Sequence, residues 1–287
     1  MQYRTDLAME LDEVFGGELS SNELRRSETQ HGAVKLIRME ICGDRAQTVL
    51  GKPKGIYVTA VLPPLSDCDT DLEEHASFIG DTLRELLPPN GTVLVAGLGN
   101  RAITPDALGP QTASLVLATR HIEGEFARAA GLDDLRPTAV IAPGVLGKTG
   151  VETGEILRGI CEVVKPSAVI AVDALAAHSV ARLGCTVQLC NSGISPGSGV
   201  GNHRKALDQQ SLGVPVVAVG VPTVVDAQVI AAEWNGGDGD DCVGNGMMVT
   251  PREIDLIIGR ASKVVAMAIN HALQPDYSPL ELITVAG

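Results

Sequence analysis

The chain has 287 residues, of which 45% are hydrophobic, so its length predicts one large domain or two small ones with a sizeable core. A net charge of −13 argues against binding nucleic acid through its phosphates, and 2% aromatic residues argue against base stacking. The six cysteines form no metal-binding spacing, the first residues lack the apolar stretch of a signal peptide, and no apolar run approaches the length of a membrane span. We therefore expect a cytoplasmic protein with reduced cysteines that binds neither nucleic acid nor a membrane.

The first third of the chain predicts a polar arm, two strands and a helix. Residues 1–30 are polar and charged and predict a loose arm. The segments 34–41 and 55–62 predict two strands, paired as a hairpin across the Gly/Lys/Pro segment between them. A helix is expected from about 69 to 87, ended by the PPNG sequence at 88–91.

The rest of the chain alternates predicted strands and helices. Strands are expected at 92–97, 138–143, 167–173, 185–190 and 214–221, and helices near 105–121, 153–165, 226–234 and 252–273. The last helix would begin with a capping box at Thr250-Pro251-Arg252-Glu253. Such alternation predicts a single α/β domain of three layers, with a mostly parallel sheet and helices on both faces.

Asp106 and Asp173 are the candidate catalytic residues. Each follows a short apolar run typical of a buried parallel strand, and ligands of open α/β sheets collect beyond the carboxyl ends of their strands. Thr104 and Pro105 predict a helix start that would keep Asp106 ionised, whereas Asp173 follows AVIAV, where poor solvation favours the protonated form. Two such acids fit general acid/base chemistry on water. The alternative is that both are structural caps of a non-catalytic binding module.

Two motifs suggest other enzymes. Gly97-Leu98-Gly99-Asn100-Arg101-Ala102 matches a dinucleotide fingerprint, but Pro105 delays the helix, and the next strand lacks the acid that would hold a ribose. Gly193-Ile194-Ser195-Pro196-Gly197 matches a serine nucleophile elbow, yet Pro196 has no N–H for an oxyanion. A nucleotide-binding α/β enzyme stays open as an alternative, and a serine hydrolase is disfavoured.

Several segments together resemble the germination proteases of spore-forming bacteria. The resemblance rests on YRTDLAMEL (3–11), GLGNRAITPDALGP (97–110), VDALAA (172–177), GISPGSGVGNHRKAL (193–207), GVPTVVDA (220–227) and VTPREID (249–255). These segments span nearly the whole chain in order, and jointly they are specific.

The resemblance implies an atypical aspartic endopeptidase that degrades small acid-soluble spore proteins during germination, in the cytoplasm of the spore core. It implies a homotetramer, no cofactor, and a fold like that of the hydrogenase maturation endopeptidases (phosphorylase/hydrolase-like). Its two catalytic aspartates fall on Asp106 and Asp173. A metal-assisted peptidase of the hydrogenase-maturation type is an alternative, but Pro105 and Ala107 leave no second acid beside Asp106 to contact a metal.

The resemblance also implies an inactive zymogen that is processed near its amino terminus. Family substrates are cut after an acidic residue and before a small apolar pair, and Thr5-Asp6-Leu7-Ala8 fits this pattern. Cleavage between Asp6 and Leu7 would divide the chain into a propeptide, 1–6, and a peptidase domain, 7–287. We expect the Gly-rich stretch 193–202 and the following basic residues to bind substrate or rearrange on activation; its candidate residues are Gly193, Ser195, Gly197, Gly199, His203 and Arg204.

Overall fold

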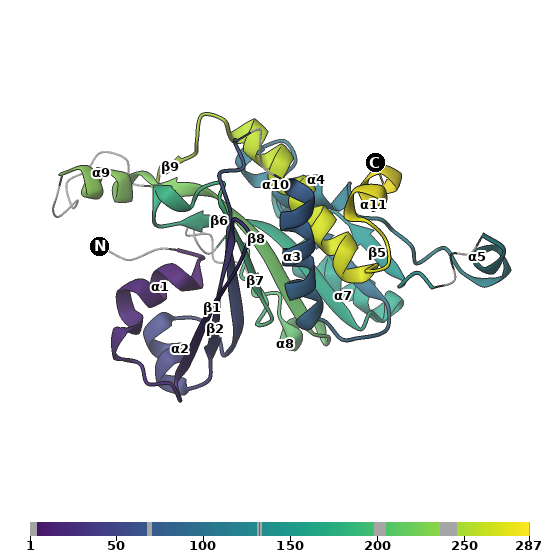
Figure 1. The fold of residues 1–287 in the computed structure, drawn as a ribbon, viewed down its shortest axis with the longest axis horizontal. Coiled ribbons are helices and arrows are strands. Elements are labelled where there is room, and N and C mark those ends of the chain that lie inside the picture. Colours follow the sequence, from purple (N-terminus) through teal and green to yellow (C-terminus); the bar gives the residue numbers. More distant parts are fainter. Residues whose placement is uncertain are drawn as a thin grey trace.

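The fold is described from a computed structural model, which covers residues 5–67, 71–130, 132, 134–197, 205–235 and 246–286. Within this part the strands form one nine-stranded sheet in the order β1-β2-β3-β7-β8-β6-β4-β5, with β9 paired to β8 (Figure 1). The strands are β1 (Leu24–His31), β2 (Val34–Ile41), β3 (Gly55–Val61), β4 (Val93–Gly97), β5 (Thr138–Ile141), β6 (Ala168–Ala177), β7 (Thr186–Cys190), β8 (Val216–Asp226) and β9 (Met248–Val249).

The sheet is mixed. Strands β5, β4, β6 and β8 are mutually parallel, whereas β1, β2, β3 and β7 pair antiparallel with their neighbours and β9 with β8. The three-layer α/β class is confirmed, and the predicted pairing of 34–41 with 55–62 is found in β2 and β3. The expectation of a mostly parallel sheet holds only for the strands β8, β6, β4 and β5.

Helices cover both faces of the sheet. They are α1 (Ala8–Phe15), α2 (Asp44–Leu50), α3 (Leu72–Glu85), α4 (Leu108–Ala113), α5 (Gly124–Ala130), α6 (Leu146–Thr149), α7 (Thr153–Val164), α8 (Gln209–Leu212), α9 (Ala227–Asn235), α10 (Ile254–Leu273) and α11 (Pro279–Ala286), with 3₁₀ turns η1 (Gly16–Glu18), η2 (Thr104–Asp106) and η3 (Val180–Arg182). One face packs against α3, α4 and α10, which Figure 1 shows together over the sheet. The opposite face carries two separate apolar clusters, one under α1 and α2 and one under α7 and α8.

The strand β6 shows how the alternation of side chains builds these layers. Its residues Ile170 and Val172 face the α3/α10 side, whereas Ala171 and Leu175 face the opposite side. Asp173 therefore points toward the opposite side, between the α1/α2 cluster and the α7/α8 cluster.

The predicted loose arm at 1–30 is wrong for its described part. Leu7 and the first residues of α1, Ala8 and Met9, are buried, and β1 pairs with β2 along its whole length. Strand β1 exposes seven of its eight residues, so it is held by backbone hydrogen bonds of an edge strand and shows no apolar pattern.

The predicted bounds of one helix and the predicted N-terminal cap of another are wrong. The segment 105–121 contains the turn η2 and the six-residue α4, and α4 is ended early because the chain turns at Ser114 and Leu115. Helix α10 begins at Ile254 with Glu253 as its N-cap and no side-chain capping bond, so the capping box is wrong. The Thr250 hydroxyl instead donates to the Thr223 carbonyl at 2.9 Å and ties the helix approach to β8.

Helix α10 is long and apolar enough to cross a membrane by length and composition alone, which the sequence analysis did not predict. However, 72% of its apolar window is buried inside the protein. A core helix passes the same test, so this is weak support for a span.

Candidate active site

Asp106 lies in the turn η2, just beyond the carboxyl end of β4. The turn contains Thr104 and Pro105, but Ile103 is its N-cap and Thr104 makes no side-chain cap. The Asp106 carboxylate is half-buried, and its Oδ2 accepts a hydrogen bond from the backbone N–H of Asn100 at 2.7 Å. Asp106 therefore sits in a 3₁₀ turn that closes the loop after β4, and not in the long helix expected from the sequence.

The glycines of the apparent nucleotide fingerprint make room for Asp106 and its helix. Gly99 has φ +107°, and a Cβ there would lie 2.2 Å from the Asp106 carbonyl oxygen and 2.9 Å from its Oδ1. A Cβ at Gly97 would lie 2.1 Å from the carbonyl oxygen of Gly109 in α4. Both glycines are accounted for by close packing within the chain, without a bound phosphate.

Asp173 lies inside β6, which runs four residues past the predicted strand end. Its residue is 5% exposed, and its Oδ1 accepts a hydrogen bond from the backbone N–H of Ala174 at 3.0 Å. Asp173 lines a cavity of about 420 Å³, which we call the central cavity. The other lining residues are Thr5, Asp6, Leu11, Leu50, Gly51, Lys52, Pro53, Tyr57, Leu175, Gln188, Cys190, Ser192, Gly193, Ile194, Ser195, Gly197, Ala206, Asp208, Ala218 and Gly220.

The floor of the central cavity is a row of three residues on neighbouring strands. Gly220 of β8 pairs with Asp173 of β6 on one side and with Gln188 of β7 on the other. Paired residues project from the same face, so Asp173 and Gln188 flank the position where Gly220 has no side chain. A Cβ at Gly220 would lie 2.5 Å from Leu175 Cγ, so that position takes no larger residue without repacking.

The predicted cleavage residues Asp6 and Leu7 lie in the same region. Leu7 is fully buried, and Asp6 lines the central cavity. The Asp6 N–H donates to the Ala176 carbonyl at 2.9 Å, and the Asp6 Oδ2 accepts from the Ala176 N–H, also at 2.9 Å. The Asp6 backbone thus lies along β6, three residues beyond Asp173.

The carbonyl oxygen of Asp6 has two side-chain donors. Lys52 Nζ donates to it at 3.1 Å, and Gln188 Nε2 donates at 3.0 Å. This carbonyl belongs to the peptide bond between Asp6 and Leu7. Neither donor was found by sequence reasoning, because each is a single polar residue with no motif around it.

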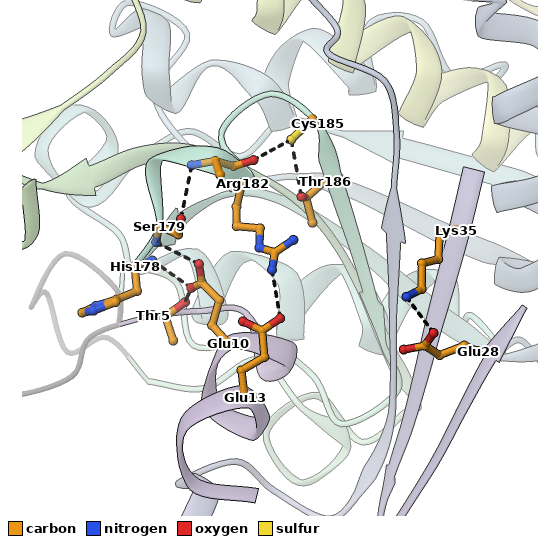
Figure 2. Close-up of polar contacts among 11 residues, drawn as sticks. Thr5, Glu10, Glu13, Glu28, Lys35, His178, Ser179, Arg182, Cys185 and Thr186 are labelled. Carbon is orange, nitrogen blue, oxygen red and sulfur yellow. Dashed lines mark hydrogen bonds and ion pairs between the residues drawn. The ribbon is translucent and has the colours of Figure 1, made fainter. Parts of the chain in front are cut away.

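Glu10 fastens helix α1 to the segment that follows β6, and it too was missed (Figure 2). It is 1% exposed, and its carboxylate accepts hydrogen bonds from the backbone N–H groups of His178 at 2.8 Å and Ser179 at 2.9 Å. The Thr5 hydroxyl also donates to Glu10, and it accepts from the Leu7 N–H at 3.0 Å. A lone acid in the short helix AMELDEVF gives no signal that distinguishes it from a solvated one.

The Gly-rich stretch reaches the cavity through its first residues. Gly193, Ser195 and Gly197 line it, and Ile194 forms a two-bond backbone bridge with Leu207. Gly199, His203 and Arg204 lie outside the described residues. Among the described residues that line the cavity, Asp106 is absent. The structure therefore brings Asp173, Asp6 and the Gly-rich stretch together, whereas Asp106 lies beyond the end of the neighbouring strand β4.

Two ionisable groups in the cavity wall, a phenol and a thiol, are uncharged near neutral pH, and burial makes both still harder to ionise. It raises the pKa of the Tyr57 hydroxyl far above its usual value of 10, and it raises the pKa of the Cys190 thiol above 9. Tyr57 instead donates to the Pro53 carbonyl at 2.8 Å and accepts from the Ser192 hydroxyl at 2.7 Å. A thiol with a raised pKa is a poor nucleophile, so Cys190 is not a candidate for covalent catalysis.

No described group of three or more His, Cys, Asp or Glu side chains is arranged to hold a metal ion. The polar groups around the cavity suit the recognition of an extended peptide, through backbone hydrogen bonds and the carboxylate of Asp173.

Comparisons with known proteins agree on one family. A family model described as germination protease (Peptidase_A25) matches residues 8–234. A germination protease of Caldanaerobacter subterraneus is 40% identical over 97% of this chain and 96% of its own length, and one of Clostridium perfringens is 38% identical over 95% of each. The germination protease of Bacillus subtilis is 39% identical over 80% of this chain and 65% of its own length.

One solved structure, a nickel–iron hydrogenase maturation protease of Thermococcus kodakarensis, aligns with a TM-score of 0.38 and 17% identity. It covers 66% of this chain and 98% of that protein. The family assignment rests on the sequence matches alone. On those matches, the chain belongs to the germination protease family of peptidases.

Proposed function

We propose that this peptidase is an aspartic-type endopeptidase that uses Asp106 and Asp173 and starts the degradation of small acid-soluble spore proteins during germination. It is made as a zymogen that cuts itself between Asp6 and Leu7, and it works as a homotetramer in the cytoplasm of the spore core. One observation carries the proposal: the peptide bond between Asp6 and Leu7 lies at the cavity that Asp173 lines, with its carbonyl oxygen hydrogen-bonded by two side chains.

The two carboxyl groups divide the chemistry. Asp106 takes a proton from water, whose oxygen attacks the peptide carbonyl carbon, and Asp173 gives a proton to the amide nitrogen as the C–N bond breaks. The products are a carboxylic acid and an amine, and the proton that Asp106 took from water replaces the one that Asp173 gave away, so the pair again holds one proton. The two roles are exchangeable, because a coupled pair of acids titrates as a unit.

The burial of Asp173 supports the acid role. Burial disfavours the charged form of a carboxyl group, and Asp173 is almost fully buried whereas Asp106 is half-buried at a turn. The position of Thr5 and Asp6 in the central cavity supports an inactive zymogen, because these residues occupy space that a substrate would need.

The test follows the mass of the purified full-length protein at mildly acidic pH, before and after an acid-soluble spore protein is added. Asp106→Asn and Asp173→Asn are compared with Asp81→Asn, a control in which an exposed carboxylate paired with Arg84 is lost. We expect wild type and the control to release residues 1–6 and cut the added protein, and both site variants to do neither while melting cooperatively. Undiminished cleavage by either site variant would remove that aspartate from the mechanism, and light scattering of the same samples tests the tetramer.

A further inference from the structure

We infer that Lys52 and Gln188 are catalytic residues, which bind the carbonyl oxygen of the scissile bond and stabilise the negative charge it acquires when water attacks. The inference rests on the proposed function and on the contacts of the Asp6 carbonyl. Both donors lie about 3 Å from that oxygen, at the upper end of the range typical of groups that stabilise an oxyanion.

Gln188 is oriented before any chemistry takes place. Its Oε1 accepts a hydrogen bond from the backbone N–H of Ala8 at 2.7 Å, and an N–H group demands an acceptor there. This fixes the amide so that its Nε2 points at the Asp6 carbonyl. Gln188 is 7% exposed, so the bond it donates is little weakened by water.

Lys52 is delivered by a turn of defined shape. Helix α2 ends at Leu50, Gly51 caps it in the left-handed conformation with φ +61°, and Lys52 follows directly. The next residue, Pro53, is held by the hydroxyl of Tyr57. Lys52 is the cationic side chain among the cavity-lining residues that the structure describes, and the other charged groups there are the carboxylates of Asp6, Asp173 and Asp208.

A positive charge at this place has a chemical use. Attack by water turns the carbonyl oxygen into an alkoxide, and the ammonium of Lys52 and the amide of Gln188 both donate to it. The alkoxide then reforms the carbonyl, the bond to the Leu7 nitrogen breaks, and that nitrogen takes a proton from the aspartate pair. Donors aimed at such a charge accelerate the step because they need no rearrangement.

The experiment measures how fast the full-length chain releases residues 1–6, by intact mass. Gln188→Glu keeps the acceptor for Ala8 and removes the donor, and Lys52→Met removes the charge with little change in length. The matched control is Lys54→Met, two residues away, whose ammonium pairs with Asp44 at 2.8 Å. We expect each site variant to slow release by about 100- to 1,000-fold, Lys52→Arg to restore much of the rate, and the control to match wild type.

Hydrogen exchange at the N–H groups of Asp6 and Ala176 separates transition-state binding from simple seating of the segment. Slow release with those two N–H groups still protected supports the inference. Slow release with protection lost would overturn it, because the donors would then only hold the segment in place. Wild-type release rates in both variants would also overturn it and leave the proposed function standing, whereas failure of wild type to cut itself or a spore protein would refute the proposed function.

Discussion

Replacing Glu10 with Gln tests whether its carboxylate holds helix α1 on the sheet. The carboxylate accepts from the N–H groups of His178 and Ser179 and is almost fully buried. Gln keeps the shape but offers one acceptor oxygen, so its amide nitrogen faces one of the two N–H groups. A hydrogen bond to a charged acceptor contributes about 1.5–3 kcal/mol, and an unpaired buried donor costs a further 1–3 kcal/mol. We expect the free energy of unfolding to fall by about 2.5–6 kcal/mol.

The assay is urea unfolding followed by circular dichroism, with linear extrapolation to water and a fixed protomer concentration. The matched control is Glu13→Gln on the same helix, which removes an ion pair with Arg182 at 2.9 Å (Figure 2). Glu13 is about half exposed, so its pair contributes at most about 1 kcal/mol. If Glu10→Gln cost no more than Glu13→Gln, the carboxylate would not be the anchor that its contacts indicate.

Two further predictions concern the loop after β4 and helix α3. Gly99→Ala should abolish most cleavage of a spore protein, because the new Cβ would displace Asp106. The control Gly147→Ala places its Cβ in open space and should keep wild-type activity. Equal activity of the two variants would show that the reaction tolerates displacement of Asp106. Burial lowers the pKa of His75, so the folded state keeps it neutral while the unfolded state binds a proton near pH 6.5. The neutral form of His75 therefore stabilises the folded state above that pH, and this contribution to the free energy of unfolding is lost as the pH falls below it. His75→Leu should make the urea midpoint depend less steeply on pH between 7 and 5. An unchanged slope would contradict this.

The parallel half of the sheet was predictable because its strands are short apolar runs. The runs before Asp106 and Asp173 are buried on both faces, so any periodicity is hidden but their length and composition still indicate strands. That is enough to put both aspartates near one edge of the sheet. The exact setting of each was not predictable, because both depend on residues distant in the sequence: the Thr223 hydroxyl donates to the Pro105 carbonyl in the turn at Asp106, and Asp6 accepts from the Ala176 N–H near the end of β6.

In the antiparallel half, β2, β3 and β7 were predicted, but β1 and the helix α1 were missed because their local signals are weak. Strand β1 is polar on both faces and depends on its pairing with β2, and helix α1 has eight residues, too few to be stable alone. In the folded protein α1 is held by the buried side chains of Leu7, Ala8, Met9 and Leu11 and by the hydrogen bonds that Glu10 accepts.

The mixed character of the sheet bears directly on the proposed chemistry. A purely parallel sheet would place all its functional groups at the carboxyl ends of strands, as Asp106 and Asp173 nearly are. Here β7 runs antiparallel to β8, so Gln188 reaches the same row as Asp173 from a strand that runs the opposite way. The turn before β3, which pairs with β7, brings Lys52 to the same cavity. The acid thus comes from the parallel half, whereas Gln188 comes from the antiparallel half and Lys52 from the turn that precedes β3.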